Sequence, residues 1–525
     1  MKRSTLAALT LLVALTTLIS PLQRELFVGD ETKYGQVIRE MRQTGSLVVP
    51  QLEGRPYTHK PPLHFWMIWA LTFPFGTGSI WPFVLPSLAA YGLLIWLSGR
   101  LAGALFGGGA EIARFVMASF WLVWGLAQTA RMDLSFTLAI SFAALMIWRW
   151  LELSRPRHLY YAAIAVGVAI LIKGPMALVM VGLLAAIDGW RRRIGWRREI
   201  PAAIGITAAI PLAWLIPAMM VGGGDYSREI LVTQNVGRAV SAWTHSEPPW
   251  FYLLHYPVTF LPWALVGILA IVAGWKRRET RDGALFCVAW MAAVVVPFSL
   301  LSSKLDVYMV PAMVPLALLL ARFLSREDGT DRLGRWGVIL SRLLVALLGI
   351  VFVLAIVVGP RFIENPSELA LARLPLVRGL FWGMGAAALV GLVLQFSWAG
   401  RSALRASVVA ALVALFPLAY FSFLLVPVAN GEISSAPLVR EIAKVTTRGS
   451  EVGLYGAPHL WARELPPGLE EVQYLGAGAL EAGPTVRVIA VRRDKAPDLG
   501  AGLREYEKVG EVVLKGKEFD VYRRE

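Results

Sequence analysis

Residues 336–359 read WGVILSRLLVALLGIVFVLAIVVG, an apolar run that carries a single charge, on Arg342. An α-helix needs roughly 20 apolar residues to cross the hydrocarbon core of a bilayer, which is about 30 Å thick. Lipid offers no water to backbone polar groups, so a spanning segment must satisfy its own hydrogen bonds, as a helix does. The run therefore predicts a transmembrane helix.

Similar runs recur along the whole chain, which has 525 residues, is 56% hydrophobic and is 17% charged. About thirteen are long enough to span: 5–22, 80–98, 111–130, 133–152, 158–172, 175–190, 201–221, 251–274, 284–301, 306–323, 336–359, 378–397 and 404–428. The segment 61–75 is short and broken by prolines, which favours a helix lying along the interface. The fold class that follows is a polytopic α-helical membrane protein.

The first run, 5–22, has an alternative explanation as a cleaved signal peptide, since Lys2 and Arg3 precede it. No small-x-small cleavage site follows the apolar stretch, which ends at Ile19-Ser20-Pro21. This pattern favours an uncleaved first helix.

Basic residues alternate between the two sets of loops and so predict the orientation. The basic-rich loops carry Arg149, Arg155, Arg157, Arg191, Arg192, Arg193, Arg197, Arg198, Lys276, Arg277, Arg278, Arg281, Arg322, Arg326, Arg332 and Arg335. In the opposite short loops Arg131, Lys173 and Lys304 stand almost alone. We therefore expect a multi-pass protein of the cytoplasmic membrane with a cytoplasmic N-terminus and an extracytoplasmic C-terminal tail.

The chain changes character after residue 428. Residues 435–447 are typical of a short helix, and 452–455, 486–491, 512–514 and 519–522 of strands separated by Gly- and Pro-rich turns. The sequence thus predicts a membrane domain, 1–428, and a small soluble α/β domain, 429–525. The second carries 14 Lys and Arg against 15 Asp and Glu, a net charge of −1.

The net charge of +15 consequently belongs to the membrane part, where basic loops face anionic lipid, and does not indicate a nucleic-acid partner. Cys287 is the only cysteine, which excludes an internal disulfide and a cysteine-based metal site.

Three predicted outer segments, 23–79, 222–250 and 360–377, are longer than a turn requires, and ordered loops of such length are usually functional. In the first, Asp30 and Glu31 open an expected helix over 31–43. Asp30 as helix cap and Glu31 as complement to the helix dipole are the plain structural alternatives to a catalytic carboxylate pair.

Polar candidates for chemistry fall on one membrane face under this topology: Asp30, Glu31, Lys60, Arg131, Asp133, Lys173, Arg238, His245, Lys304 and Tyr308. Interfacial anchoring or ion pairing would explain each of them singly. Together, cations beside carboxylates suit displacement of a phosphate leaving group, with a carboxylate taking the proton of an attacking hydroxyl. If the acceptor is itself a phosphate, no base is needed, and Asp30 would orient the acceptor.

Two further expectations concern local geometry and metals. Lys304 and Tyr308 are spaced i and i+4, which predicts a shared helix face. His59, His64 and His245 leave open a divalent metal site, although their spacing carries no metal-binding signature.

The ordered motifs resemble those of the lipid-linked-sugar glycosyltransferases with the GT-C fold, in particular the aminoarabinose lipid A transferases and the protein O-mannosyltransferase-like group. The motifs are Gly-Asp-Glu-Thr-Lys-Tyr-Gly at 29–35, Lys-Pro-Pro-Leu-His-Phe-Trp at 60–66, Arg-Met-Asp at 131–133, Lys-Gly-Pro at 173–175, Pro-Pro-Trp-Phe-Tyr at 248–252, Leu-Pro-Trp at 261–263 and Ser-Lys-Leu-Asp-Val-Tyr-Met-Val-Pro at 303–311.

The resemblance implies an inverting transfer of a sugar from a polyprenyl phosphate donor to an acceptor lipid, glycan or protein. It implies catalytic roles for Asp30, Glu31 and Asp133, and contacts to the donor phosphate from Lys60, Arg238, Lys304 and Tyr308, to which we add Arg131 and Lys173. In aminoarabinose transferases an acidic residue often precedes the Lys-Pro pair, whereas this chain has His59. The sugar, the acceptor and a requirement for a divalent metal are therefore left open, and the resemblance implies no other cofactor.

Two other classes of function use similar lipid-linked substrates. A transporter or flippase would be favoured by charges deep within the apolar runs, which hold few. A glycan polymerase or ligase would be favoured by a large outer loop in the second half of the chain, whereas here the loop richest in candidates is the first.

Overall fold

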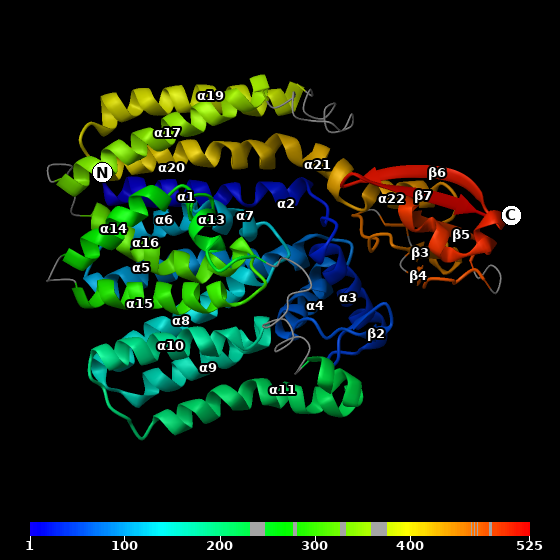
Figure 1. The fold of residues 1–525 in the computed structure, drawn as a ribbon, viewed down its shortest axis with the longest axis horizontal. Helices are drawn as coiled ribbons and strands as arrows, with labels where there is room; N and C mark the ends of the chain where they lie inside the picture. Colours follow the sequence, from blue (N-terminus) through cyan, green and yellow to red (C-terminus); the bar gives the residue numbers. More distant parts are fainter. Residues whose placement is uncertain are drawn as a thin grey trace. The chain divides into compact units, whose positions relative to one another are not determined.

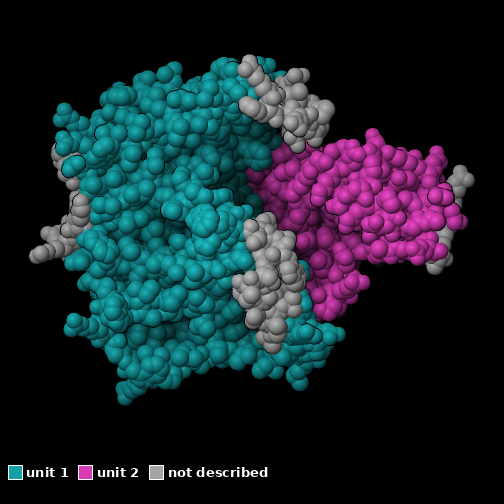
Figure 2. Space-filling view, in the orientation of Figure 1, with its two compact units in different colours: residues 1–19, 59–61, 87–425 teal, residues 20–58, 62–86, 426–525 magenta. Residues whose placement is uncertain are grey.

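The computed structural model describes residues 1–230, 247–276, 281–325, 332–358, 375–463, 465–466, 468–469, 471–481 and 486–524. The chain forms two compact units (Figure 2). Unit 1 holds residues 1–19, 59–61 and 87–425, and unit 2 holds residues 20–58, 62–86 and 426–525.

Unit 1 is helical (Figure 1). Its elements are α1 (Arg3–Thr16), α5 (Trp81–Phe106, from Ser87 onward), α6 (Ala110–Ser119), α7 (Trp121–Ala127), α8 (Asp133–Leu153), α9 (Pro156–Lys173), α10 (Met176–Arg191), α11 (Ile200–Arg228), α13 (Phe251–Thr259), α14 (Ala264–Lys276), α15 (Arg281–Leu300), η3 (Asp306–Met309), α16 (Val310–Leu324), α17 (Arg332–Val358), α19 (Pro375–Leu394), η5 (Gln395–Ala399), α20 (Ala403–Tyr420) and η6 (Phe421–Leu425).

The expectation of a polytopic helical membrane protein is confirmed. Within the described residues, 9 helices are long and apolar enough to cross a membrane, or up to 11 if the bent pairs α6–α7 and α13–α14 each form one span. The count of thirteen is not confirmed, because two of the expected spans, α9 and α10, are not long and apolar enough to cross a membrane. Helix α9 has Arg157 and Lys173 near its ends, and α10 has 16 residues, a length of about 24 Å.

Close helix packing in unit 1 depends on small residues. A Cβ atom on Gly391 of α19 would lie 2.5 Å from Cγ2 of Val413 on α20, and one on Gly349 of α17 would lie 2.7 Å from Cβ of Ala388 on α19. Helices in lipid associate largely through such close van der Waals contact. Gly349 and Gly391 therefore allow α17, α19 and α20 to approach closely.

The predicted outer loop 222–250 is partly helical. Helix α11 continues to Arg228 beyond a break at Gly223, whose φ of 76° is readily adopted by glycine. The break at Gly223 agrees with the predicted end of this helix at 221, whereas the helical stretch that follows the break was not predicted. Residues 231–246 of this loop, and 359–374 of the third predicted loop, lie outside the described residues.

Unit 2 combines helices with a sheet. Its elements are α2 (Ile19–Gln23, from Ser20), α3 (Asp30–Thr44), β1 (Gln51–Leu52), β2 (Arg55–Pro56), α4 (Leu63–Phe75), α21 (Val426–Ile433), α22 (Ala436–Ala443), η7 (Gly449–Glu451), β3 (Val452–Tyr455), β4 (Gln473–Tyr474), β5 (Val488–Arg492), η8 (Arg493–Leu499), η9 (Ala501–Glu505), β6 (Glu507–Leu514) and β7 (Lys517–Arg523).

The five-stranded sheet has the order β4-β3-β5-β7-β6, with β4, β3 and β5 parallel and β7 antiparallel to both of its neighbours. Successive residues of β5 point to opposite faces. Val488 and Ala490 join the core formed with α22, and Ile489 and Val491 join a second core on the other face.

The four strands predicted from sequence are present, and their ends agree with the prediction to within two residues. The exception is the start of β6, which begins at Glu507 and not at residue 512. Strand β4 was missed because two residues give no readable alternation. A separate domain starting at 429 stays a prediction, since the compact unit that holds 426–525 also takes in 20–58 and 62–86.

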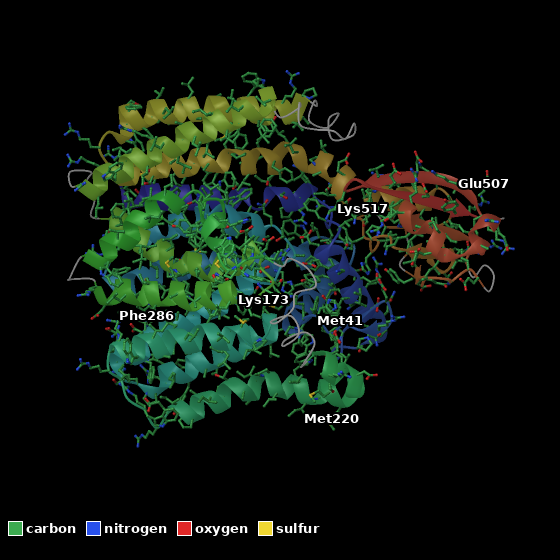
Figure 3. The ribbon with its side chains drawn as sticks, in the orientation of Figure 1. Met41, Lys173, Met220, Phe286, Glu507 and Lys517 are labelled. Carbon is green, nitrogen blue, oxygen red and sulfur yellow. The ribbon has the colours of Figure 1, made fainter. Side chains whose placement is uncertain are left out.

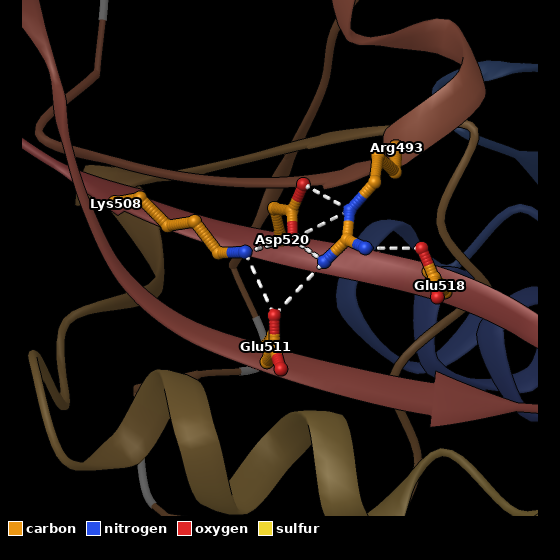
Figure 4. Close-up of polar contacts among 5 residues, drawn as sticks. All are labelled: Arg493, Lys508, Glu511, Glu518 and Asp520. Atoms are coloured by element: carbon orange, nitrogen blue, oxygen red, sulfur yellow. Dashed lines mark hydrogen bonds and ion pairs between the residues drawn. The ribbon is translucent and has the colours of Figure 1, made fainter.

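An ion-pair network ties β7 to β6 and to η8 (Figure 4). Asp520, which is 3% exposed, accepts hydrogen bonds from Arg493 Nη2 at 2.7 Å and forms an ion pair with Lys508 Nζ at 2.9 Å. Arg493 also pairs with Glu518 and, at 2.9 Å, with Glu511. The Arg493 hydrogen bond, supported by Lys508, holds the pKa of Asp520 below its usual range although burial acts in the opposite direction.

The substitution Asp520→Asn should destabilise the sheet by about 1–2 kcal/mol, because charge-assisted hydrogen bonds are lost while both cations can still reach water. Hydrogen exchange of β5 and β7 amides in the purified full chain measures the effect. The pKa of Asp520 is lower in the folded than in the unfolded state, so the ionised carboxylate stabilises the fold. Wild-type protection should therefore fall as the pH drops below about 4, the ordinary pKa of an aspartate side chain. Glu518→Gln, at an exposed partner, should change protection by less than about 0.5 kcal/mol; an equal effect would contradict the central role of Asp520.

Candidate active site

Asp133 is the centre of a charged cluster at adjoining helix ends of unit 1. It is the first residue of α8, is 3% exposed, and bridges two cations. Its Oδ1 accepts a hydrogen bond from Lys173 Nζ at 2.6 Å, and its Oδ2 accepts one from Arg131 Nε at 3.1 Å. A buried carboxylate requires such partners, because desolvating an isolated charge is very costly.

Backbone geometry places both cations. Lys173 is the last residue of α9, and Gly174 ends that helix with a φ of 107° before Pro175 caps α10. The main-chain carbonyl of Arg131 accepts a hydrogen bond from Ser87 Oγ at 2.7 Å, which fixes the turn before α8. The Lys-Gly-Pro and Arg-Met-Asp motifs are thus turns that bring side chains from two helix ends together.

Aromatic rings complete the surroundings of Lys173. Its Nζ lies 4.9 Å from the centre of the Tyr308 ring and 5.5 Å from that of Phe136, within the range of cation–π attraction. Tyr308 stacks on Phe298 with ring centres 4.8 Å apart and 21° between the planes. Four predicted site residues, Arg131, Asp133, Lys173 and Tyr308, therefore form one cluster. Figure 3 labels Lys173 among the helices of unit 1.

Lys304 is arranged differently from the prediction. Leu305 has an extended backbone and η3 starts only at Asp306, so Lys304 and Tyr308 do not share a helix face, and that expectation is wrong. Lys304 is buried, and its Nζ donates to the carbonyls of Glu247 at 2.7 Å and Leu301 at 2.5 Å. An ammonium has three donors, so at least two serve the chain itself.

Two residues of this region were missed by the sequence interpretation. Asp306 Oδ1 accepts a hydrogen bond from Thr259 Oγ1 at 2.6 Å and lies 3.1 Å from His255 Nδ1. The His255 ring stacks on Phe251 with centres 3.8 Å apart. Asp306 lies within the motif 303–311, and this position in a motif was the sequence feature that could have identified it. His255 had none, because the contact joins helices far apart in sequence.

Asp30 and Glu31 lie at the start of α3 in unit 2 and have different surroundings. Helix α3 begins at Asp30 and Gly29 takes the cap position, so the alternative of Asp30 as the cap is off by one residue. Asp30 is exposed, whereas Glu31 is 6% exposed, pairs with the buried Arg24 and accepts the Phe27 N–H at 2.9 Å. Arg24 also lies over the Phe27 ring at 4.2 Å. No motif pointed to Arg24.

The remaining predicted residues are less informative. Lys60 is half-buried and His59 exposed, in the short segment 59–61 assigned to unit 1. His64 is buried among the rings of Tyr34 and Phe65 in unit 2. Arg238 and His245 lie outside the described residues. In the portion of the chain that the structure describes, no group of three or more His, Cys, Asp or Glu could hold a metal ion, and a site that includes His245 is untested.

The fold resembles that of the GT-C lipid-linked-sugar glycosyltransferases, and the resemblance predicted from the motifs is confirmed. The family model described as dolichyl-phosphate-mannose-protein mannosyltransferase matches residues 59–220. That region contains Lys60, Arg131, Asp133 and Lys173.

Particular relatives are similar over more of the chain. The undecaprenyl phosphate-α-4-amino-4-deoxy-L-arabinose arabinosyl transferase 1 of Pseudomonas fluorescens (strain Pf0-1) is 28% identical over 61% of this chain and 58% of its own length. The corresponding transferase of Yersinia pestis (strain Pestoides F) is 27% identical over 68% of this chain and 66% of its own length. The matched region thus spans less than two thirds of each relative.

A solved structure agrees over nearly the entire fold. The crystal structure of ArnT from Cupriavidus metallidurans bound to undecaprenyl phosphate superposes with a TM-score of 0.76, covering 99% of this chain and 97% of that one, at 21% sequence identity. This likeness establishes a shared fold with many differing side chains, so the chemistry has to be argued from the residues of this chain.

The structure predicts a large contribution to stability from Glu31 and a small one from its neighbour Asp30. Glu31→Gln should lower the free energy of unfolding of this helix by about 3 kcal/mol, because it takes the negative charge from a buried ion pair. Asp30→Asn should change it by less than about 0.5 kcal/mol, as is usual at exposed positions.

Hydrogen exchange of α3 amides in the purified full chain distinguishes the two variants. Equal protection in Glu31→Gln and wild type would show that the Arg24–Glu31 pair contributes nothing to the stability of unit 2.

Proposed function

We propose that the protein is an inverting glycosyltransferase that moves a sugar from a polyprenyl phosphate donor to an acceptor lipid, glycan or protein. The observation that carries the proposal is the cluster in which Asp133 holds Arg131 and Lys173 beside Tyr308. The names of the curated relatives and the undecaprenyl phosphate bound to the similar crystal structure support the class of donor.

The chemistry needs a cationic environment for the leaving group. An acceptor oxygen attacks the anomeric carbon as the bond from that carbon to the phosphate oxygen breaks, and the electron pair stays on the departing polyprenyl phosphate. Cations that are fixed before the reaction stabilise this developing charge without reorganising. Lys173 gives one of its three hydrogens to Asp133, and the other two remain for phosphate oxygens.

Asp133 acts in this proposal by positioning. Its carboxylate fixes both cations and offsets part of their mutual repulsion, and the Tyr308 ring limits where the Lys173 ammonium can move. Lys60 and Arg238 are proposed as further phosphate ligands. Lys304 is proposed to contribute through its remaining donor, while its carbonyl contacts brace residues 301 and 247.

Asp30 is proposed to meet the acceptor. Its exposure at the first turn of α3 suits a carboxylate that accepts a proton from an attacking hydroxyl or that orients an acceptor phosphate. Glu31 is proposed to support it, since the Arg24 pair and the Phe27 N–H fix the start of the helix.

The site would face the extracytoplasmic side. The alternation of Lys and Arg between loops supports a cytoplasmic N-terminus, and it supports residues 429–525 as a domain outside the cytoplasmic membrane. Donor and acceptor would then meet where the lipid-linked sugar presents its head group.

Asp30→Asn and Lys60→Ala test the enzyme against a transporter. Asp30→Asn should lower sugar transfer by about 10²-fold or more, because a proton acceptor or orienting group is lost, at unchanged folding. Lys60→Ala should raise KM for the polyprenyl phosphate donor. The measurement is transfer of radiolabelled sugar from undecaprenyl phosphate by purified protein in vesicles.

Glu507→Gln is the matched control, since it makes the same carboxylate-to-amide change at an exposed strand position of unit 2 labelled in Figure 3. Full transfer by both Asp30→Asn and Lys60→Ala would refute the assigned roles. Translocation of the lipid-linked sugar with no transfer by the wild type would support a flippase instead.

A second pair of variants separates the role of Asp133 in transfer from its role in folding. Asp188, at the other end of α10, is also buried and also bridges two cations, Arg191 at 2.7 Å and Arg192 at 2.8 Å. Asp133→Asn and Asp188→Asn should both lower the midpoint of thermal unfolding. Only Asp133→Asn should lower kcat, by about 10²-fold.

The comparison is made per folded molecule, by size-exclusion chromatography followed by the transfer assay. A similar loss of kcat in both variants would mean that Asp133 serves the fold alone.

A further inference from the structure

A cavity of about 240 Å³ lies within unit 2, away from the Asp133 cluster in the chain. It is bounded by the first turn of α3, the loop after β3, the end of β5 and the hairpin of β6 and β7. Its lining residues are Val28, Gly29, Thr32, Lys33, Gly456, Ala457, Pro458, His459, Arg492, Leu514, Lys515, Lys517 and Phe519. We call this cavity the lysine pocket.

The lysine pocket joins an apolar floor to a basic rim. Leu514 and Phe519 are buried at the base, with Ala457 and Pro458 beside them. The rim carries Lys33, Lys515, Lys517, Arg492 and His459. Figure 3 labels Lys517 where β7 begins. Such a combination suits a ligand that has both a carbon skeleton and a negative charge.

Among the described residues, acidic side chains contact two of the five basic groups. Arg492 pairs with Asp494 at 2.5 Å, and His459 Nε2 lies 3.0 Å from Glu53 Oε1, whose pKa this hydrogen bond lowers. Lys515 donates a hydrogen bond to the carbonyl of Val28, which carries no formal charge. Within the residues that the structure describes, the ammonium groups of Lys33 and Lys517 make no hydrogen bond or ion pair. Three lysine charges therefore converge on one cavity.

The hairpin turn fixes one of these lysines in an uncommon conformation. Leu514 pairs with Lys517 across the ladder, so Lys515 and Gly516 form a two-residue turn with φ of 51° and 68°. Two positive φ values in succession favour Asn-Gly or Asp-Gly. A lysine at the first of these positions costs backbone energy, and its ammonium is held at the pocket by the Val28 carbonyl.

We infer that the lysine pocket binds an anionic saccharide, a sugar ring that bears a phosphate or carboxylate group. The volume equals that of about eight waters in the liquid, which admits a monosaccharide. Phe519 and Pro458 offer apolar contact to the C–H groups of a sugar ring, and the lysines bind the anion. Inorganic phosphate would leave the apolar floor without a partner.

The position of the lysine pocket links it to the proposed transfer. Gly29, Thr32 and Lys33 belong to the same turn as Asp30. If the proposed function holds, and this part of the inference rests on it, the pocket binds the charged sugar of the acceptor next to the residue that would meet the acceptor oxygen. The pocket itself stands on its own contacts.

The binding test uses glucose 1-phosphate and the purified full chain, with glucose and inorganic phosphate as comparison probes in isothermal titration. Glucose 1-phosphate should bind more tightly than either. Lys33→Met with Lys517→Met should raise its Kd at least tenfold, and added salt should do the same. Lys444→Met, which removes an exposed charge outside the pocket, should leave Kd unchanged.

Ala457→Trp provides a second variant, because it fills the lysine pocket without changing charge. It should also abolish binding while α3 and the sheet keep their hydrogen-exchange protection. Equal affinity for glucose or inorganic phosphate, or unchanged binding in Ala457→Trp and in the double lysine variant, would overturn the inference.

Vesicles separate a lipid head group from a soluble sugar as the source of the ligand. The protein is reconstituted in vesicles that contain 10 mol% glucuronosyl diacylglycerol, and vesicles with 10 mol% phosphatidylglycerol serve as the control. Glucose 1-phosphate should bind more weakly in the first vesicles, because the glucuronosyl head group competes for the lysine pocket. Lack of competition would overturn the acceptor role.

The pocket and the proposed function can fail independently. Sugar transfer without glucose 1-phosphate binding would refute the pocket alone, and binding without sugar transfer would refute the proposed function alone.

Discussion

The buried carboxylate of Asp133 is the constraint on which the candidate site depends. An acid that is 3% exposed is stable only if its charge is compensated, and here the ends of α8 and α9 supply Lys173 and Arg131. The same bonds hold the two cations beside Tyr308 and its stacking partner Phe298. Electrostatic need and helix packing thus fix one geometry, and a phosphate-bearing donor would meet cations that are already in place.

Unit 2 follows a related logic at the start of α3. The Arg24–Glu31 pair and the Phe27 N–H fix the first turn, and that turn exposes Asp30 and contributes one wall of the lysine pocket. One of two adjacent acids therefore serves the fold and leaves the other accessible. The β6–β7 hairpin, tied through Asp520 to Arg493 and Lys508, holds the opposite wall.

Similar folds support many reactions, so the shared fold does not specify the reaction, which depends on the side chains of the site. The likeness to ArnT over almost the entire chain establishes the fold. This chain has His59 where aminoarabinose transferases often have an acidic residue, and the lysine pocket is the feature from which we infer the chemistry of the acceptor.

Hydrophobic run length by itself determined the class of fold, because the bilayer fixes how many apolar residues a helix needs. Strong β-propensity likewise revealed β3, β5 and β7, and turn motifs marked Arg131, Asp133 and Lys173. Sequence could not show that Lys304 leaves the helix before Tyr308, that Arg24 compensates Glu31, or that His255 contacts Asp306. These facts depend on tertiary structure, since a contact across distant segments is set by which partners burial brings together, and no local spacing encodes it.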